Sequence, residues 1–383
     1  MTPEQRLAVL ISFSGAGGVE RMVLNLLPAI LRQGIAVDLL AILRQPVPDL
    51  VRIEGSGLRL FDLGVGHTTL AVPALVRYLK TERPAALLAA KDRAIRAAVL
   101  AKALSGVETR LVGRLGTNLS AAQEGKPAWQ RWLRTQPMRW VYPRVDRVVA
   151  VSTGVAEDTV RLTGLPASRV VVVRNPVITP DMADKAAEPV EHPWFADKTC
   201  PLILGAGRLT RQKDFDTLIQ AFGQVRAQRE CRLMVLGEGK LRGDLERRVR
   251  ELGLETSVAL PGHVRNPYAH LAKADLFVLS SRWEGSCNVL TEAMALGTPV
   301  VSTDCPSGSA EILGGGRYGP LVPVGDVDQL ADAMLYALDH PTAPDSLKAA
   351  VAEYNAEHSA RRYLEILGFA PREENTPATA NAA

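Results

Sequence analysis

The sequence has few cysteines, few aromatic residues and no long apolar run. Only four of its 383 residues are cysteine, namely Cys200, Cys231, Cys287 and Cys305. No Cys-x-x-Cys motif and no paired histidines accompany them, which argues against a disulfide framework and against a zinc site. The first apolar run, Leu7–Phe13, is too short to span a membrane, and no small-residue cleavage site follows it. We therefore expect a cytoplasmic protein.

The net charge of +4 conceals a strong asymmetry. Residues 1–175 carry 24 Lys and Arg against 13 Asp and Glu, a balance of +11. Residues 176–383 carry 21 against 28, a balance of −7. Such asymmetry indicates that the first half faces an anionic partner. The sequence holds no nucleic-acid recognition motif. An anionic membrane surface or a pyrophosphate-linked acceptor therefore fits better than nucleic acid.

The order of apolar and polar segments predicts two domains. A chain of this length exceeds one ordinary hydrophobic core. In each half, short apolar strands alternate with longer helices, which is typical of a parallel sheet built from βαβ units. We predict the fold class α/β, with two tandem Rossmann-like, doubly wound domains that bind ligands at the carboxyl ends of their sheets.

Composition sets the predicted boundaries of these domains. Residues 1–175 form the first domain, and residues 176–199, rich in Pro, Asp and Ala, are predicted as a linker. Residues 200–350 form the second domain, and residues 351–368 are predicted as a final helix. Residues 369–383 are polar and rich in Ala, Asn, Thr and Pro, which predicts a disordered tail.

Two acidic residues, Glu284 and Glu292, flank the start of a predicted helix, Asn288–Leu296. Gly285 and Ser286 before this helix are small enough for a ligand to approach the backbone. Free N–H groups and the dipole of a helix N-terminus favour a phosphate. A carboxylate can also accept two hydrogen bonds from the adjacent hydroxyls of a sugar. The alternative is that both acids are solvated charges at a helix end.

These acids belong to a longer pattern in the second half. Glu284 and Glu292 form Glu-x7-Glu, and Glu292 opens Glu-Ala-Met-Ala-x-Gly-x-Pro-Val-Val. The pattern continues through three further segments, Gly205–Ile219, Val235–Gly239 and Cys305–Leu313. Residues 200–325 resemble the retaining, nucleotide-sugar-dependent glycosyltransferases of the GT-B fold, the bacterial group 1 type. The first half resembles this family mainly at Gly15–Glu20.

The resemblance implies where the ligands bind. It places the donor site in the cleft between the two domains, and it makes residues 351–368 a helix that crosses back to the first domain. Carried over by position, Glu284 holds hydroxyls of the transferred sugar and Glu292 binds the ribose. Backbone N–H groups at the helix start reach the sugar and the diphosphate, and they belong to Ser286, Cys287, Asn288 and Val289. The family more often has Pro or Gly at Cys287, a change that a backbone contact tolerates.

Arg208 and Lys213 give a second phosphate signal. Arg208 directly follows a predicted strand that ends at Gly207, and Lys213 precedes the next predicted helix. Two cations on one loop suit a diphosphate leaving group, whose charge grows as its bond to the sugar breaks. By resemblance they neutralise this diphosphate, so no cofactor and no divalent metal is expected. The alternative is a pair of ordinary surface cations.

The glycine-rich turn Gly15–Glu20 opens the first predicted helix. With Asp38 as a ribose-binding acid it suggests a dinucleotide fingerprint, but Glu20 occupies the third glycine position and the fingerprint fails. Such a turn still binds anions, so Gly17 and Gly18 are predicted to meet the donor phosphate. The alternative is a structural turn. Asp38 lies inside an apolar strand and is predicted as a structural partner.

Two Asp-x-Asp strings, Asp214–Asp216 and Asp326–Asp328, open predicted helices. We predict that they are helix N-caps rather than metal ligands.

Members of the family that this sequence resembles often carry a histidine near the reacting sugar, on the loop after the fourth strand of the first domain. The corresponding segment here, Val112–Ser120, contains no histidine. The candidates to replace it as hydrogen-bond donors are Arg114, Thr117 and Asn118. The acceptor-positioning residue therefore stays unassigned.

The segment Trp129–Arg144 packs three Trp, one Tyr and four Arg into a short stretch. This combination suits a membrane interface, where rings lie at headgroup level and cations meet anionic lipid. The alternative is a helix that packs against a domain and exposes a basic face. With the positive first half in view, we predict that the protein binds peripherally to the inner face of the cytoplasmic membrane.

Together these features predict a transferase that moves a hexosyl or N-acetylhexosaminyl unit from a nucleotide sugar, most simply a UDP-sugar, with retention. The predicted acceptor is a sugar or a lipid-linked oligosaccharide of envelope polysaccharide or lipopolysaccharide synthesis. One alternative is a sugar-nucleotide epimerase on a related fold, which would need an acid–base partner for Glu284. The other is a non-catalytic nucleotide-sugar-binding protein, which is expected to have lost some of Arg208, Lys213, Glu284 and Glu292.

Overall fold

The structure is a computed structural model that describes residues 6–13, 18–43 and 57–370. Its contacts divide the chain into two compact units. The first unit comprises Met1–Arg114, Val141–Val148 and Glu357–Ala383, and the second comprises Leu115–Trp140 and Val149–Ala356. The domain boundaries drawn from the sequence stay predictions. Most of the predicted tail, from residue 371 on, lies outside the described residues.

The first sheet has seven strands in the order β3-β2-β1-β4-β5-β6-β7. Its central pairings, β1 with β2 and β1 with β4, are parallel. The chain runs from β1 out to β3 and returns to β4 on the other side of β1, which is the doubly wound pattern. The strands are β1 (Arg6–Phe13), β2 (Ala36–Leu43), β3 (Leu58–Asp62), β4 (Ala86–Ala90), β5 (Arg110–Leu115), β6 (Arg147–Ala150) and β7 (Val170–Val172).

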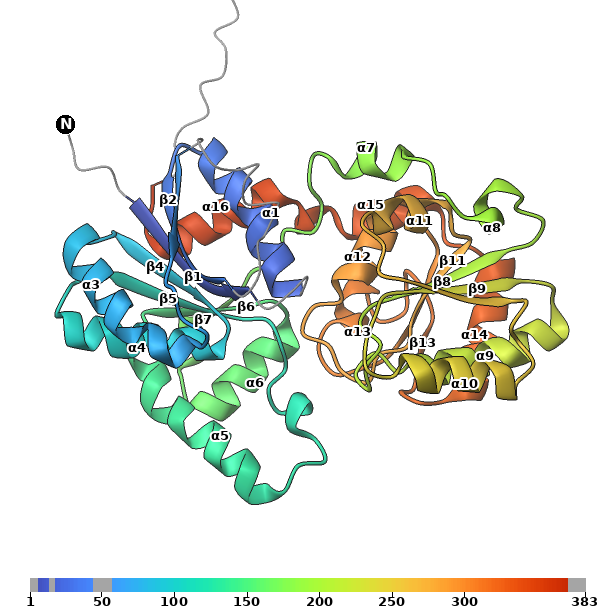
Figure 1. Cartoon of the computed structure of the whole chain (residues 1–383), viewed down its shortest axis with the longest axis horizontal. Helices are drawn as coiled ribbons and strands as arrows, with labels where there is room; N and C mark the ends of the chain where they lie inside the picture. The colour runs from blue at the N-terminus through green and yellow to red at the C-terminus, as the bar shows by residue number, and fades with distance from the viewer. Residues whose placement is uncertain (1–5, 14–17, 44–56, 371–383) are drawn as a thin grey trace, which may run out of the picture. The chain divides into compact units, whose positions relative to one another are not determined.

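Helices connect these strands and cover both faces of the sheet (Figure 1). The α-helices of this part are α1 (Gly18–Arg32), α3 (Val72–Glu82), α4 (Asp92–Ser105), α5 (Ala128–Val141) and α6 (Thr153–Thr163). Short 3-10 turns occur at η1 (Thr68–Ala71), η2 (Ala121–Gln123), η3 (Tyr142–Arg144) and η4 (Ala167–Arg169).

The second sheet has six strands in the order β10-β9-β8-β11-β12-β13. The pairings of β8 with β9 and with β11 are parallel. The chain again goes out to one side of its first strand and returns on the other, so the direction reverses between β8 and β11. The strands are β8 (Leu202–Ala206), β9 (Arg232–Leu236), β10 (Val258–Gly262), β11 (Leu276–Leu279), β12 (Val300–Thr303) and β13 (Leu321–Val322).

The helices of the second half include two that the sequence did not predict, α7 and α8, in the segment predicted as a linker. The full set is α7 (Met182–Ala187), α8 (Pro193–Ala196), α9 (Phe215–Gln228), α10 (Arg242–Glu251), α11 (Pro267–Lys273), α12 (Asn288–Ala295), α13 (Ser309–Ile312), α14 (Val327–Asp339), α15 (Pro344–Ala350), η5 (Ala352–Tyr354) and α16 (Ala356–Leu367). Almost all of α16 belongs to the first unit although it ends the described chain.

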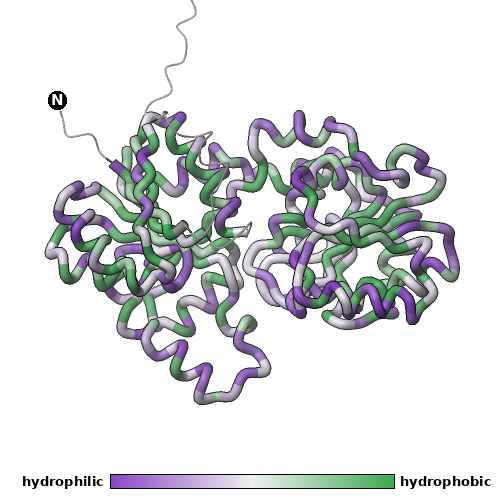
Figure 2. Tube along the Cα trace, viewed as in Figure 1, coloured by the Kyte–Doolittle hydropathy of each residue, from purple (hydrophilic) through white to green (hydrophobic). Residues whose placement is uncertain are grey.

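The second sheet separates two hydrophobic cores. Ile203 contributes to the core with α9, α10 and α14, while Leu202 and Leu204 contribute to the core with α11, α12 and α15. This follows because successive side chains of a strand point to opposite faces of the sheet. Figure 2 shows the strands of this sheet mainly in the hydrophobic colour. Met182 of α7 is part of the second core, so the predicted linker is packed structure.

Asp38 of β2 is a structural partner, as the sequence predicts. Its carboxylate is fully buried and accepts hydrogen bonds from Arg59 at 2.7 Å and from the hydroxyl of Tyr78 at 2.7 Å. Burial acts to raise the pKa of Asp38, but the bonds from Arg59 and Tyr78 and the charge of Arg6 outweigh it and lower the pKa. The charged form therefore stabilises the edge of the first sheet.

The part of the chain that the structure describes contains no helix long and apolar enough to cross a membrane.

Candidate functional site

The predicted donor-site residues lie where the second sheet reverses its strand order. Neighbouring strands β8 and β11 end side by side, and their chains then depart in opposite directions. In an open α/β sheet, ligands bind outside the carboxyl ends of the strands at this position. The loop after β8 carries Arg208 and Lys213, and the loop after β11 carries Glu284. Two segments about 70 residues apart in sequence thus meet at one point.

Glycines bring these loops close together. Gly207 has a φ of 154°, and a Cβ atom there would lie 2.9 Å from Cε of Lys213. A Cβ atom on Gly237 would lie 2.0 Å from the carbonyl oxygen of Gly207. Glycine is therefore required at both positions for the Lys213 side chain to pass over the strand ends.

Lys213 and Glu284 form a buried ion pair. Nζ of Lys213 lies 2.6 Å from Oε1 of Glu284, and the side chains are 16% and 9% exposed. The hydroxyl of Ser281 donates to the same carboxylate oxygen at 2.8 Å. Burial acts to lower the pKa of Lys213, but the pairing with Glu284 outweighs it and raises the pKa. The ammonium group is thus held charged and fixed in position.

Further hydrogen bonds clamp the two loops to each other. Gln212 donates its side-chain N–H to the carbonyl oxygen of Trp283 at 2.9 Å, and the backbone N–H of Arg282 donates to the carbonyl oxygen of Gln212 at 2.8 Å. Ser280 donates to the carbonyl oxygen of Lys213 at 2.8 Å. Because both backbones are tied, the positions of the ammonium and the carboxylate are set by the fold.

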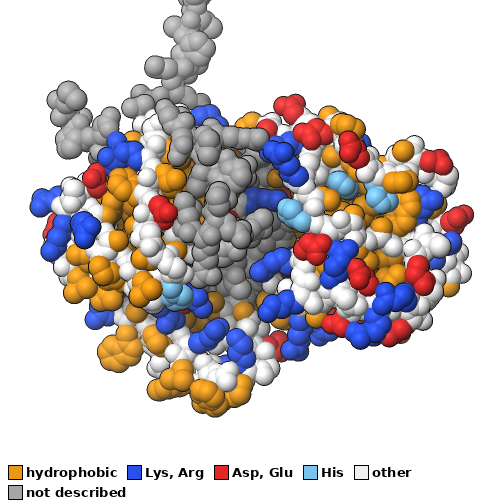
Figure 3. Space-filling model, in the orientation of Figure 1, with side chains coloured by type: hydrophobic (Ala, Val, Ile, Leu, Met, Phe, Trp, Pro, Cys, Tyr) orange, Lys and Arg blue, Asp and Glu red, His pale blue; other side chains and the backbone are white. Residues whose placement is uncertain are grey.

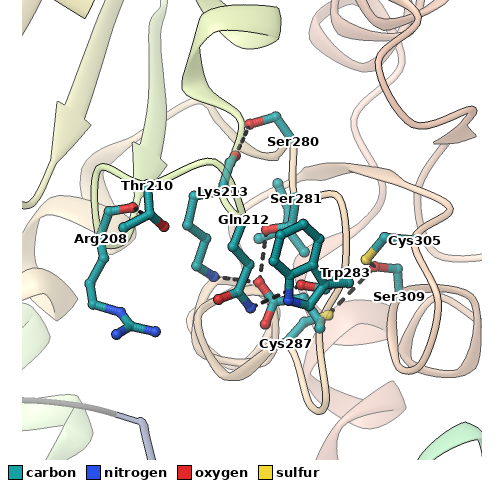
Figure 4. A network of polar contacts seen from close by, with 12 residues as sticks. Arg208, Thr210, Gln212, Lys213, Ser280, Ser281, Trp283, Cys287, Cys305 and Ser309 are labelled. Carbon is teal, nitrogen blue, oxygen red and sulfur yellow. Dashed lines mark hydrogen bonds and ion pairs between the residues drawn. The ribbon is translucent and has the colours of Figure 1, made fainter. Parts of the chain in front are cut away.

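Arg208 differs from Lys213 in its surroundings. Its side chain is exposed, and within the described residues its guanidinium has no hydrogen bond or ion pair. Figure 4 shows the Arg208 and Lys213 side chains extending in the same direction from one loop. The site therefore offers one fixed, buried cation and one exposed cation available to an anion, an arrangement that suits a diphosphate.

Helix α12 begins as the sequence predicts, at Asn288. Glu292 is buried and lies about one turn into this helix. The hydroxyl of Ser286 is buried without a hydrogen-bond partner in the described part of the chain. The side-chain oxygen of Asn288 accepts from Asn175 at 2.8 Å, and Val289 is half-buried.

Gly17, Gly18 and Asn118 were also predicted as candidate site residues. Gly18 is the exposed first residue of α1, whereas Gly17 lies outside the described residues. Asn118 donates to the hydroxyl of Ser307 at 2.8 Å and accepts from the backbone of Ala121, so its amide is already engaged.

Arg114, the second candidate to replace the family histidine, is buried in the first unit. Burial lowers its pKa against the opposing effects of Tyr363 and Glu20. Its side chain lies near Tyr363 of the same unit and is enclosed there. No candidate for the acceptor-positioning role emerges from either residue.

The two Asp-x-Asp strings have different roles. Asp326 caps α14 by accepting the backbone N–H of Gln329, as predicted. Asp214 precedes α9 without a side-chain cap, so that prediction was wrong. Its carboxylate instead accepts from Thr217 at 2.9 Å and pairs with Arg282 at 2.9 Å. Over the described residues, no three His, Cys, Asp or Glu side chains are grouped to hold a metal ion.

Ser281, Gln212 and Arg282 were not predicted from the sequence as site residues. Ser281 contacts the Lys213–Glu284 pair directly, and Gln212 and Arg282 hold together the two loops that carry it. Ser281 lies three residues before Glu284 on the same loop, and this short separation was an available signal. The partnership of Gln212 with Trp283 was not, because it depends on how two loops meet.

Family models match both halves of the chain. Residues 200–340 match the model described as glycosyl transferases group 1, and residues 16–179 match the model described as glycosyltransferase family 4.

Curated relatives match over part of their length. An N-acetylgalactosamine-N,N'-diacetylbacillosaminyl-diphospho-undecaprenol 4-alpha-N-acetylgalactosaminyltransferase of Campylobacter jejuni is 32% identical over 199 residues, 52% of each chain. The lipopolysaccharide core biosynthesis glycosyltransferase LpsE of Rhizobium meliloti is 31% identical over 180 residues, 45% of this chain and 51% of the relative. The matches thus span about half the length of these relatives.

A solved structure matches nearly the whole chain. HepE of Anabaena, in complex with UDP and glucose, superimposes with a TM-score of 0.74 at 18% identity, over 95% of this chain and 99% of that one. This likeness confirms the predicted fold class, two parallel-sheet α/β domains of the GT-B type.

Because Lys213 and Glu284 form a buried ion pair, substitutions of the two residues should have non-additive effects on the free energy of unfolding. Lys213→Met or Glu284→Gln should each lower the free energy of unfolding by about 3 kcal/mol, because each leaves a buried charge without its partner. The double variant should lose less than the sum of the two, with a coupling of about 1–3 kcal/mol in denaturant unfolding. Arg208→Ala, on the same loop but exposed, is the control and should change stability by no more than about 0.5 kcal/mol. Additive effects of the two substitutions would contradict the pairing.

Proposed function

Because residues 200–340 match the glycosyl transferases group 1 model and residues 16–179 match the glycosyltransferase family 4 model, we propose that the protein is a retaining glycosyltransferase. The proposed donor is a UDP-sugar that carries a hexosyl or N-acetylhexosaminyl unit, and the proposed acceptor is a sugar or a lipid-linked oligosaccharide. The observation that carries this proposal is the fixed Lys213–Glu284 pair beside the exposed Arg208 at the strand ends of the second sheet.

Support for the substrates comes from the named relatives. The Campylobacter relative acts on an undecaprenyl diphosphate-linked sugar, the Rhizobium relative acts in lipopolysaccharide core biosynthesis, and the Anabaena structure contains UDP. The proposed setting is envelope polysaccharide or lipopolysaccharide synthesis, because the Rhizobium relative is named for lipopolysaccharide core biosynthesis and the Campylobacter relative for a lipid-linked acceptor. The two alternatives, an epimerase and a non-catalytic binding protein, are not favoured, because the relatives are transferases and Arg208, Lys213, Glu284 and Glu292 are all present.

In the proposed reaction, an acceptor hydroxyl attacks the anomeric carbon on the same face of the sugar from which the diphosphate leaves. The new oxygen–carbon bond forms as the bond from carbon to the diphosphate breaks, and the hydroxyl proton passes to a diphosphate oxygen. Negative charge develops on that diphosphate. Lys213, already charged and immobile, and Arg208, free to close on the ligand, stabilise this charge with little reorganisation.

The two acids divide the donor between them in this proposal. Glu284 accepts hydrogen bonds from hydroxyls of the transferred sugar through the carboxylate that Lys213 and Ser281 hold in place. Glu292, buried one turn into α12, accepts the ribose hydroxyls. Backbone N–H groups at the start of α12 bind the diphosphate, as a helix N-terminus favours. We also propose that the two cations replace a divalent metal and that no cofactor is needed.

Helix α5 supports the proposed membrane association. Within the described residues Met138 is its only buried side chain, while Trp129, Trp132 and Trp140 are 62%, 59% and 72% exposed. Spacings of three, eight and eleven residues place these rings near one face of the helix. Figure 3 shows hydrophobic side chains gathered in the part of the view where α5 lies, with Lys and Arg beside them. The helix has no acidic residue, so we propose that it docks on anionic lipid.

Loss of either cation should slow transfer. Arg208→Ala and Lys213→Ala are each expected to lower turnover by on the order of 100-fold, as expected for lost charge stabilisation of a leaving group. Turnover is measured with a UDP-sugar in buffer containing EDTA, in which the wild type should stay active. Arg211→Ala, an exposed arginine on the same loop, is the matched control. Wild-type turnover in a folded Arg208 or Lys213 variant would refute the diphosphate role.

Substitutions of Glu292 and Glu284 should have different effects, the first on the affinity for UDP and the second on the rate of sugar transfer. Glu292→Gln should weaken the affinity for free UDP by about 1.5–3 kcal/mol, the range for a hydrogen bond to a charged group. Glu284→Gln should lower the transfer rate while UDP binding is kept, because its partner is the moving sugar. Calorimetry with UDP distinguishes them, and the reverse result would exchange the two assignments.

Vesicle binding should depend on α5. Each Arg near an anionic surface contributes about 1 kcal/mol of attraction, screened over about 10 Å at 0.1 M salt. Replacing the three Trp by Ala, or Arg131, Arg134 and Arg139 by Gln, should release the protein from phosphatidylglycerol vesicles in co-sedimentation while UDP binding persists. Tyr336→Ala removes an equally exposed aromatic ring on α14 and should have no effect. A wild type that ignores these vesicles at low salt would make α5 a packing helix for another protein surface.

A further inference from the structure

Two buried cysteines meet beside the Lys213–Glu284 pair. Cys287 immediately precedes α12, and Cys305 follows β12. The Sγ atoms of Cys287 and Cys305 lie 3.5 Å and 3.3 Å from one oxygen, Oγ of Ser309. Figure 4 shows both sulfurs directed towards Ser309, next to the residues that hold the candidate donor site.

The two thiols are chemically unequal. The adjacent thiol of Cys287 lowers the pKa of Cys305, and the charge of Lys213 acts in the same direction, although burial opposes both. The adjacent thiol of Cys305, together with burial, raises the pKa of Cys287 well above its ordinary value. Cys305 is therefore the more acidic thiol of the pair. It also lines a cavity of about 370 Å³ with Thr153, Pro306 and Glu311, which gives a small molecule access.

We propose that Cys287 and Cys305 are a redox modification site, at which hydrogen peroxide or another hydroperoxide produces an intrachain disulfide that weakens nucleotide binding. The effect on nucleotide binding rests on the proposed function. Formation of the disulfide does not. The paired cysteines, the shared Ser309 and the cavity at Cys305 carry the proposal.

The chemistry balances with one peroxide. Sγ of Cys305 attacks one peroxide oxygen, the O–O bond breaks, and a sulfenic acid and one water result. Sγ of Cys287 then attacks Sγ of Cys305, and the sulfenic hydroxyl leaves with a proton as a second water. The two thiols together lose two electrons and two protons, and the peroxide is reduced to two waters.

The disulfide would displace the backbone that the donor needs. An S–S bond is about 2.05 Å long, so these two free thiols must move together to form one. Cys287 directly precedes the helix start whose N–H groups are proposed to bind the diphosphate. The opposite loop is tightly packed, since a Cβ atom on Gly308 would lie 3.3 Å from Sγ of Cys287. A shift of about 1 Å in such a site can cost on the order of 100-fold.

The test treats the reduced wild-type protein with hydrogen peroxide and has two independent readouts. Peptide mapping by mass spectrometry without reduction should find Cys287 linked to Cys305. Calorimetry should show the affinity for UDP falling by about tenfold or more, and dithiothreitol should restore it. Cys305→Ser should bind UDP before and after peroxide alike. Cys200→Ser, which removes a partly exposed cysteine elsewhere, should respond like the wild type.

Two results would overturn this inference: peroxide that leaves Cys287 and Cys305 unlinked, or a mapped disulfide with unchanged UDP affinity. If Cys305→Ser does not fold, the wild-type mapping and its reversal by dithiothreitol decide alone. A reduced wild type that binds no UDP would contradict the proposed function instead, because mapping detects the disulfide without any ligand.

Discussion

A charged lysine held against a charged glutamate inside the second unit is the constraint on which the site depends. Neither group is stable there alone, since an isolated buried charge is costly. Together, at 2.6 Å and with Ser281 as a third partner, they fix the loop after β8 against the loop after β11. The fold brings those loops together because β8 and β11 are neighbours in the sheet. The strand order therefore determines which two segments can cooperate.

The same arrangement has a consequence for chemistry. Because the ion pair exists before any ligand arrives, Lys213 needs no new conformation to meet the proposed diphosphate, and preorganised charge is what stabilises a developing anion most effectively. Glu284 gains from the pairing as well, because its carboxylate is aimed by Lys213 and Ser281 rather than left to solvent. Arg208, exposed and without a partner in the described residues, supplies the adaptable part. One rigid and one movable cation can follow a leaving group as its charge grows.

Much of this could be predicted from the sequence, and the reasons are local. The apolar runs before Gly207 and Arg282 gave β8 and β11, and the helix formers after Asn288 gave α12 at its observed start. The residues of the candidate donor site stand in short sequence motifs, so they could be recognised from the sequence alone. Partnerships across loops were not. Gln212 with Trp283, and Asp214 with Arg282, join segments about 70 residues apart, and no periodicity in either segment encodes the other.

Packing also overrode local composition in ways that bear on the site. Residues 176–199 look like a linker because Pro and Asp interrupt any periodicity, yet Met182 enters a core and anchors the segment beside α11. Cys287 is a stronger case. As a sequence feature it is a tolerated replacement at a backbone contact, but in the fold its side chain turns inward and meets Cys305 from a different loop. A position that needs only a backbone N–H leaves its side chain free to acquire a second use. The chemistry of that side chain is then decided by what the neighbouring loop places against it.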